Sequence, residues 1–156
     1  MAAVYGEERV NYYTNDHQYG AQVAVLAGGG YVVSWVSRGQ DGSGDGIYAR
    51  RYDAAGNALG DEFRVNEASY SEQRSPDIAA TGDGGFVITW RDHGGDDIYA
   101  QKFDAAGARV DGQVQISSPA TYSDDAPLFT EKKIDSTLRF VPQMTWTFGG
   151  GSWILD

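Results

Sequence analysis

The stretch "GIYARRYDAAGNALGDEFRVN" (Gly46–Asn66) occurs a second time, with changes, as "DIYAQKFDAAGARVDGQVQIS" (Asp97–Ser117). The similarity extends upstream, because Asn11–Trp35 aligns without a gap on Asn66–Trp90. Self-similarity with a period of roughly fifty residues is typical of propellers and solenoids. The chain therefore contains two clear copies of one structural unit.

A third and weaker copy follows these two. The segment "SPATYSDDAP" (Ser118–Pro127) is similar to "EASYSEQRSP" (Glu67–Pro76), and Trp146 repeats the place of Trp90. The third copy has no equivalent of the "DAAG" turn or of the strand after it, whereas "EERVN" (Glu7–Asn11) matches "EFRVN" of the first unit. We therefore expect a single repeat domain over residues 1–156, with units at about 12–66, 67–117 and 118–156 plus 7–11.

Each complete unit predicts four short strands separated by glycine-rich turns. In the first unit these strands are "AQVAVLA", "GYVVSWVS", "GIYARRYD" and "DEFRVN". Short runs of β-branched and aromatic residues favour strands, and four antiparallel strands in about fifty residues make one blade of a propeller. We predict an all-β, β-propeller-like fold with about three four-stranded blades per chain, in which the N-terminal strand closes the last blade. Trp35, Trp90 and Trp146 lie mid-strand at equivalent places, which favours packing between blades over stacking on sugars.

Three blades are fewer than the about four to eight with which propellers close. Assembly of several copies resolves this difficulty, and we favour a homodimer with a ring of about six blades. The N-terminal strand would then complete a blade of its own chain or of its neighbour. A compact monomer would instead favour a three-unit barrel or pinwheel.

The charge of the chain limits its partners. The sequence has 12 Lys and Arg residues against 22 Asp and Glu residues, a formal net charge of -10. This charge disfavours nucleic acid and anionic membranes as partners. No apolar run reaches the about eighteen residues of a membrane span, so membrane insertion is not expected. The chain has no cysteine, which excludes disulfides, thiolate metal sites and a cysteine nucleophile.

The combination of "GGFVITW", "DIYAQKFDAAG" and "DGSGDGIYARRYDAAGN" resembles a family of repeats of roughly fifty residues. Those repeats occur in tandem in very large secreted bacterial proteins that carry hemolysin-type (RTX) calcium-binding segments. The resemblance covers Gly6 to Pro127 well and Leu128 to Asp156 poorly. It implies propeller or adhesin modules in an extracellular, calcium-rich setting, secreted or at the cell surface. The RTX nonapeptide itself is not present, so its calcium chemistry is not carried over.

The loop "DGSGDG" (Asp41–Gly46) is the candidate metal site. Asp41, Ser43 and Asp45 place oxygen-bearing side chains at alternate positions before a glycine, as in loops that bind calcium. The twelfth position of such a loop is Tyr52 instead of a bidentate Glu, and the second unit shortens the loop to "RDHGGDD". The alternatives are a calcium site and an Asp/Gly hairpin loop chosen for its turn geometry.

Three polar loops that lead into the units form the candidate ligand-binding surface. They come from equivalent places, Asn11–Gly20, Asn66–Ser75 and Ser117–Ala126, so we expect them to gather on one face. Their aromatic and hydrogen-bonding side chains suit the rings and hydroxyls of a glycan, although the same composition is ordinary for solvated loops. The predicted contact residues are Tyr12, Tyr13, His17, Tyr19, Tyr70, Arg74 and Tyr122.

Catalysis has little support in the sequence. The two histidines occupy non-equivalent places, and neither belongs to a metalloprotease or nucleophile-elbow motif. The neighbouring carboxylates of Asp96 and Asp97, or of Asp124 and Asp125, leave a glycoside hydrolase pair open. We expect an extracellular binding module, lectin-like or adhesive. The alternatives are a structural spacer module of a surface protein and a polysaccharide hydrolase or lyase on a propeller scaffold.

Overall fold

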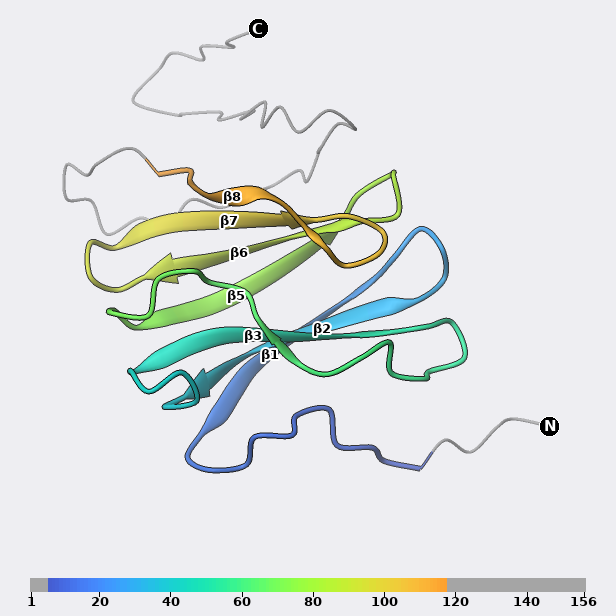
Figure 1. The fold of residues 1–156 in the computed structure, drawn as a ribbon, viewed down its shortest axis with the longest axis horizontal. Helices are drawn as coiled ribbons and strands as arrows, with labels where there is room; N and C mark the ends of the chain where they lie inside the picture. Colours follow the sequence, from blue (N-terminus) through green and yellow to red (C-terminus); the bar gives the residue numbers. More distant parts are fainter. Residues whose placement is uncertain (1–5, 118–156) are drawn as a thin grey trace, which may run out of the picture.

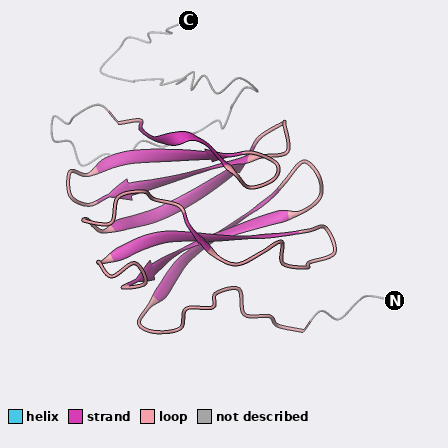
Figure 2. Cartoon of the chain, in the orientation of Figure 1, coloured by secondary structure: helices cyan, strands magenta, loops and turns pink. Residues whose placement is uncertain are grey.

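The computed structural model describes residues 6–117, which form strands and their connecting loops (Figure 1, Figure 2). In chain order the strands are β1 (Gln18–Val25), β2 (Tyr31–Arg38), β3 (Asp45–Tyr52), β4 (Phe63–Arg64), β5 (Gln73–Ala80), β6 (Phe86–Asp92), β7 (Asp97–Phe103) and β8 (Arg109–Gln115). They make two four-stranded antiparallel sheets, sheet 1 in the order β1-β2-β3-β4 and sheet 2 in the order β5-β6-β7-β8. The all-β prediction, with four strands in each of the first two units, is confirmed.

The strand bounds differ from the predicted ones at two places. β1 begins at Gln18 instead of Ala21 and contains an irregularity at which Gly20 adopts a φ of 66°. β5 has an equivalent irregularity at Ser75, with a φ of 55°, so this bend belongs to the repeat. β4 covers only Phe63–Arg64 of the predicted "DEFRVN" strand, because side-chain hydrogen bonds replace the regular ladder beyond it.

An asparagine holds the end of this fourth strand. The Val65 amide donates to the Ile47 carbonyl (2.7 Å), and the Ile47 amide donates to Asn66 Oδ1 (2.8 Å). Asn66 Nδ2 donates in turn to Gln73 Oε1 (3.0 Å) and to the Ala68 carbonyl. One buried side chain therefore joins the last strand of the first unit to the third strand and to the start of the second unit.

The two "DAAG" segments form equivalent turns. The Gly56 amide donates to the Asp53 carbonyl (3.1 Å), and the Gly107 amide donates to the Asp104 carbonyl (2.9 Å). Both glycines have a positive φ, 87° and 85°, which an L side chain rarely adopts. The prediction that these segments are structural turns is confirmed.

The hydrophobic core lies between the two sheets. Because side chains alternate along a strand, each sheet has two faces. The back face of sheet 1 carries the buried Val32, Val36 and Ala49. The front face of sheet 2 packs against it with the buried side chains Ile78, Phe86, Ile88, Trp90 and Phe103. β5 lies against β1, β2 and β3, so the sheets stack face to face, and each large apolar side chain buried there contributes about 1.5–3 kcal/mol.

Two of the three equivalent tryptophans belong to the packed interior. Trp35 and Trp90 are both buried, and Trp90 stacks on Tyr99 with ring centroids 6.1 Å apart. A buried indole cannot offer its face to a sugar. Packing between the sheets is confirmed for Trp90, which belongs to the core cluster, whereas Trp35 is buried on the front face of sheet 1, away from sheet 2. Trp146 lies outside the described residues.

Within residues 6–117 both sheets are open, and the ring closure predicted from the sequence is not seen there. The segment Glu7–Asn11 belongs to neither sheet. This part of the chain contains no helix, hence none long and apolar enough to cross a membrane. The architecture established for the first two units is two stacked, open, antiparallel sheets.

Candidate functional site

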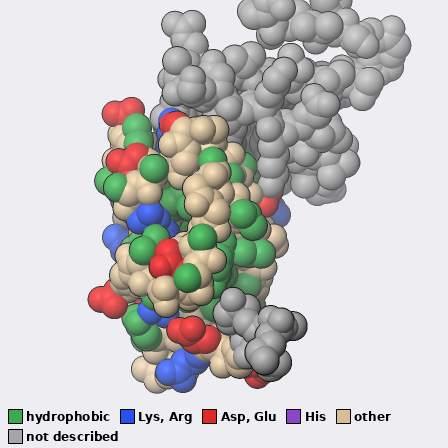
Figure 3. Space-filling view, turned by 90° about the vertical axis from the view of Figure 1, so that its right-hand side faces the viewer, with side chains coloured by type: hydrophobic (Ala, Val, Ile, Leu, Met, Phe, Trp, Pro, Cys, Tyr) green, Lys and Arg blue, Asp and Glu red, His purple; other side chains and the backbone are tan. Residues whose placement is uncertain are grey.

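The loops that lead into β1 and β5 lie at the same end of the two sheets (Figure 1). Segments 13–17, 39–44, 65–72 and 93–96 share this end, which we call the loop end. The opposite end, the turn end, carries the tight turns 26–30, 53–57, 81–85 and 104–108, and Figure 3 shows acidic, basic and hydrophobic side chains interspersed there. The expected gathering of equivalent loops is therefore seen for the first two. The third loop, with Tyr122, lies outside the described residues.

Asp45 joins two of the predicted ligand-binding residues at the loop end. The Tyr19 hydroxyl donates to Asp45 Oδ2 (2.7 Å), and Arg74 Nε donates to the same oxygen (2.7 Å). Tyr19 and Arg74 occupy equivalent positions on β1 and β5, and Asp45 is the first residue of β3. The structure thus brings together three residues that the sequence assigned to two separate sites.

Glu72 completes this group, which we call the Asp45 cluster (Tyr19, Asp45, Glu72 and Arg74). Arg74 Nη2 donates to Glu72 Oε2 (2.6 Å), so the guanidinium lies between two carboxylates. The hydrogen bond to Asp45 raises the pKa of Arg74, and burial followed by the hydrogen bond to Asp45 raises the pKa of Tyr19. Tyr19 is therefore a neutral hydrogen-bond donor at physiological pH, which argues against a nucleophilic phenolate.

The Asp45 cluster keeps exposed surface for a ligand. The Tyr19 side chain is 43% exposed, and the side chains of Arg74 and Glu72 are also partly exposed. Asp45 is buried beneath them, and its Oδ1 has no hydrogen-bond partner among the described residues. The arrangement offers an aromatic ring beside charged hydrogen-bonding groups, which is the chemistry of a binding surface.

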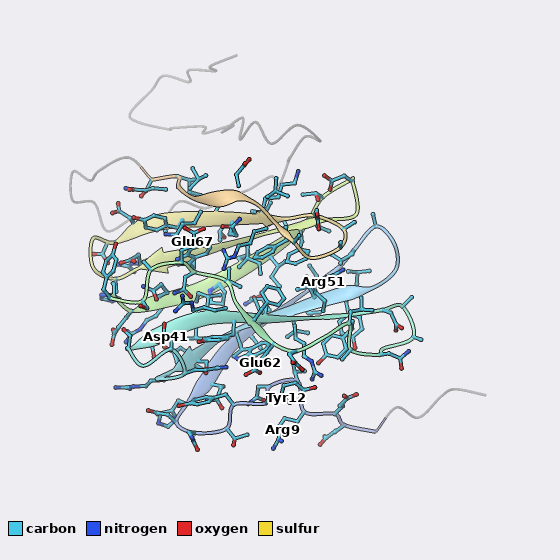
Figure 4. The ribbon with its side chains drawn as sticks, viewed as in Figure 1. Arg9, Tyr12, Asp41, Arg51, Glu62 and Glu67 are labelled. Carbon is cyan, nitrogen blue, oxygen red and sulfur yellow. The ribbon has the colours of Figure 1, made fainter. Side chains whose placement is uncertain are left out.

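The side chains of the predicted metal-binding residues Asp41 and Asp45 have different partners and do not converge on one point. Asp41 Oδ1 accepts a hydrogen bond from the Ser43 amide (3.0 Å), and Asp41 Oδ2 lies 3.8 Å from Arg64 Nη1. Asp45 is engaged by Tyr19 and Arg74 instead. Figure 4 shows Asp41 at the loop end, and nowhere in residues 6–117 do three carboxylate, imidazole or thiol side chains gather to hold a metal ion. The loop has the hydrogen bonding of an Asx turn, and calcium binding stays a prediction.

Tyr12 and Tyr13 make contacts within the chain. Their amides donate to the two carboxylate oxygens of Glu62, at 2.7 Å from Tyr12 and 3.2 Å from Tyr13. The Arg50 guanidinium lies over the Tyr12 ring, 4.2 Å from its centroid, and donates to the Tyr12 hydroxyl. Tyr12 and Glu62 lie beside one another in Figure 4. These contacts dock the N-terminal segment on sheet 1, so one face of the Tyr12 ring is already occupied.

Sequence reasoning missed this Arg50 contact. Arg50 lies in the middle of β3 and is buried, and its place in the second unit is taken by Gln101, which is also buried. Both side chains donate to equivalent carbonyls, Arg50 to Gly60 and Gln101 to Asp111. A polar residue at the same inward position of both units was the available signal.

Tyr70 and His17 are the most accessible of the predicted contact residues that lie within residues 6–117. Tyr70 is 86% exposed in the loop before β5. The His17 side chain is also exposed, and its Nε2 lies 3.8 Å from Asp16 Oδ1. Both can meet a ligand without displacing packed side chains.

The neighbouring carboxylates Asp96 and Asp97 do not form a pair. Asp96 accepts from Arg91 (2.8 Å), whereas Asp97 accepts from the Ser117 hydroxyl (3.0 Å). Two side chains directed to different partners do not hold one substrate bond between them. Asp124 and Asp125 lie outside the described residues.

The exposed groups of the loop end, Tyr19, Tyr70, Glu72 and Arg74, are therefore the part of the described chain best suited to a ligand. No protein-family model, curated protein or solved structure matches the chain. Function is inferred from these residues and from the repeats.

Proposed function

We propose that sheets 1 and 2 are successive blades of a β-propeller. Each is a four-stranded antiparallel sheet in which strands adjacent in the chain are adjacent in space, as a blade requires. The sheets stack face to face with their first strands, β1 and β5, in contact. Equivalent hydrogen bonds recur from one unit to the next, which supports a regular rotation between units.

We propose that the chain acts as an extracellular binding module, lectin-like or adhesive, through the loop end. The observation that carries this proposal is the Asp45 cluster, where equivalent positions of two successive units, Tyr19 and Arg74, meet on one carboxylate with part of their surface exposed. Every added unit presents another loop at the same end. Such a surface is multivalent, which strengthens weak individual contacts. The resemblance to tandem repeats of secreted bacterial proteins supports the extracellular setting.

A neutral or basic glycan is the ligand class that fits these groups. The exposed ring of Tyr70 can stack on the apolar face of a sugar, while Arg74 and Glu72 can bind hydroxyls. The net charge of -10 opposes strongly anionic polysaccharides. Nucleic acid is disfavoured for the same reason.

The test is a glycan array with the full chain, followed by calorimetry on the best ligand. We expect Tyr70→Ala and Arg74→Ala each to weaken binding about tenfold, equivalent to about 1.4 kcal/mol. Leu59→Ala is the matched control, because Leu59 is an exposed hydrophobic residue (52%) outside the loop end and should leave affinity unchanged.

Two other outcomes would replace the proposal. Absence of binding to any glycan on the array would favour a structural spacer module. Release of reducing ends from a polysaccharide, abolished by Asp45→Asn without loss of thermal stability, would favour a hydrolase or lyase on this scaffold.

We also propose a test of calcium at the Asp41 loop. If Asp41 and Ser43 bind calcium, millimolar calcium should raise the melting temperature of the wild-type chain and leave Asp41→Asn unchanged. An equal response of both proteins, or none, would leave the loop as a hairpin turn only.

A further inference from the structure

The front faces of the two sheets are equivalent in sequence and differ in their cover. Ile78 on β5 is 5% exposed, because the back face of sheet 1 packs on it. Its equivalent on β1, Val23, is 65% exposed. Val23 is therefore exposed to solvent in the first unit, although the equivalent position in the second unit packs in the core.

Two neighbours of Val23 differ from their equivalents in the same way. Phe86 and Ile88 of sheet 2 are fully buried, whereas their equivalents in sheet 1, Tyr31 and Val33, are only half-buried. Farther along this face Trp35 and Tyr52 are as buried as their equivalents in sheet 2, so the open part of the face is the region around Val23. Val23 and Val33 are cross-strand partners, so these side chains form one continuous patch. In sheet 2 the matching patch is covered by the back face of sheet 1, which is a copy of the same repeat.

The N-terminal segment shows where a sheet in front of sheet 1 would lie. The Tyr12 amide donates to Glu62 (2.7 Å), and the equivalent Glu67 amide donates to the equivalent Gln113 (2.8 Å). The segment that ends at Asn11 therefore contacts sheet 1 in the way that β4 and the residues after it contact sheet 2. β4 is the last strand of sheet 1, the sheet that precedes sheet 2. By analogy, the segment ending at Asn11 fits as the last strand of a sheet that precedes sheet 1.

Asn11 has the same contacts as Asn66, with one missing. Its Nδ2 donates to the Tyr13 carbonyl (2.7 Å) and to Gln18 Oε1 (3.3 Å), matching the Asn66 bonds to Ala68 and Gln73. Asn66 Oδ1 also accepts the amide of a third strand, and no donor within residues 6–117 reaches Asn11 Oδ1. The vacant acceptor matches a third strand supplied from outside the described residues.

We propose that the front face of sheet 1, centred on Val23, is an interface for a second copy of this chain. The second copy packs the back face of a sheet on the patch, and the segment ending at Asn11 serves as the fourth strand of that sheet. Because β3 and β7 are already paired with β4 and β8, the sheet that fits is the third unit expected from the sequence, which lacks a fourth strand of its own. A third unit that stacks on the back face of sheet 2 lies on the far side of the molecule from the front face of sheet 1. It would reach that front face only if three sheets closed into a ring, and propellers close with about four to eight blades. The contact is head to tail, and two such contacts close a ring. It depends on the blade arrangement proposed above and not on glycan binding.

The test is the mass of the full 156-residue chain at about 10 and 100 µM by light scattering and native mass spectrometry. We expect twice the 16.9 kDa of one chain. Val23→Glu should raise the dissociation constant at least about 100-fold, because it buries an unpaired charge. Val25→Glu is the matched control on the same strand, since Val25 is 70% exposed and its equivalent in the covered sheet, Ala80, is exposed too.

A second measurement reports the interface directly and does not depend on a charge substitution. Because the chain has no cysteine, Val23→Cys and Val25→Cys each carry a single thiol. At about 100 µM we expect alkylation of Val23→Cys to be at least about tenfold slower than that of Val25→Cys, and the two rates to converge on dilution.

Three results would overturn the interface: a wild-type mass of one chain at both concentrations, a Val23→Glu mass equal to the wild type, or equal alkylation rates in the concentrated samples. Circular dichroism of each variant checks that its sheets are intact. Glycan binding enters none of these measurements, so the interface and the proposed function can fail separately.

Discussion

The two units repeat the same strands but use one matching position differently. Arg51 on β3 reaches out of its sheet and donates to the carbonyls of Ala105 and Ala106 in the "DAAG" turn of the second unit (Figure 4 labels Arg51). Its equivalent, Lys102, pairs with Asp83 of its own sheet at 3.1 Å. The first unit has Gly28 where the second has Asp83, so Arg51 lacks a partner at that place in its own sheet. The repeat fixes the strands, and the neighbours of each unit decide what its side chains bind.

The largest expected difference between the units is at Ile78 and Val23. Ile78→Ala should lower the free energy of unfolding by about 2–5 kcal/mol, because it opens a cavity between the sheets. Val23→Ala should cost below about 0.5 kcal/mol in dilute protein, where its side chain is exposed. Urea unfolding at submicromolar concentration measures both. Equal losses would show that the two front faces have the same cover.

The next difference concerns the equivalent asparagines. Asn66→Ala should cost about 2–3 kcal/mol, since it leaves the buried Ile47 amide without its acceptor. Asn11→Ala should cost about 1 kcal/mol in dilute protein, because only the Nδ2 bonds are lost. Chemical unfolding monitored by tryptophan fluorescence provides the values. A larger loss at Asn11 than at Asn66 would contradict this ranking.

A smaller effect is expected at Arg51. Arg51→Lys keeps the charge but cannot reach both carbonyls with one planar group, so we expect a loss of about 1 kcal/mol. Arg91→Lys is the control, because the exposed Arg91–Asp96 pair should contribute at most about 0.5 kcal/mol. Thermal unfolding of both variants checks the difference. Equal melting temperatures would mean that the contact between the units contributes nothing.

The smallest effect is a change in acid stability at Asp83. The Thr81 hydroxyl, then the Gly85 amide and Lys102, lower the pKa of Asp83 to about 2. The unfolded chain has a pKa of about 4 there, so the stabilisation is complete above about pH 4 and is lost as the pH falls toward 2. Asp83→Asn should flatten the stability curve over that interval. Unfolding curves recorded from about pH 5 to about pH 2 test this, and parallel curves for both proteins would contradict it.

The fold followed from local patterns, because strand alternation and glycine turns are written in short stretches of sequence. The strands of both units, the "DAAG" turns and the buried positions of Trp35 and Trp90 were predicted in this way. Propeller closure concerns contacts beyond the described residues and stays a proposal.

The site was harder to predict, because its partners lie far apart in the chain. Tyr19 and Arg74 were predicted as ligand contacts and Asp45 as a metal ligand, yet Tyr19 and Arg74 both donate to Asp45. That meeting depends on how sheet 2 stacks on sheet 1, which no local pattern specifies. Tyr12 was assigned to a ligand for the same reason, since the reach of Arg50 across the N-terminal segment is a tertiary contact.

The two ends of the sheets differ in how much their lengths vary between units. The loop between β2 and β3 spans residues 39–44, and its counterpart between β6 and β7 spans only 93–96, whereas the "DAAG" turns keep one length. This change in length falls at the loop end, away from the carbonyls to which Arg51 donates. Insertions or deletions at the loop end can therefore change that surface while the contact that stacks the two sheets stays the same.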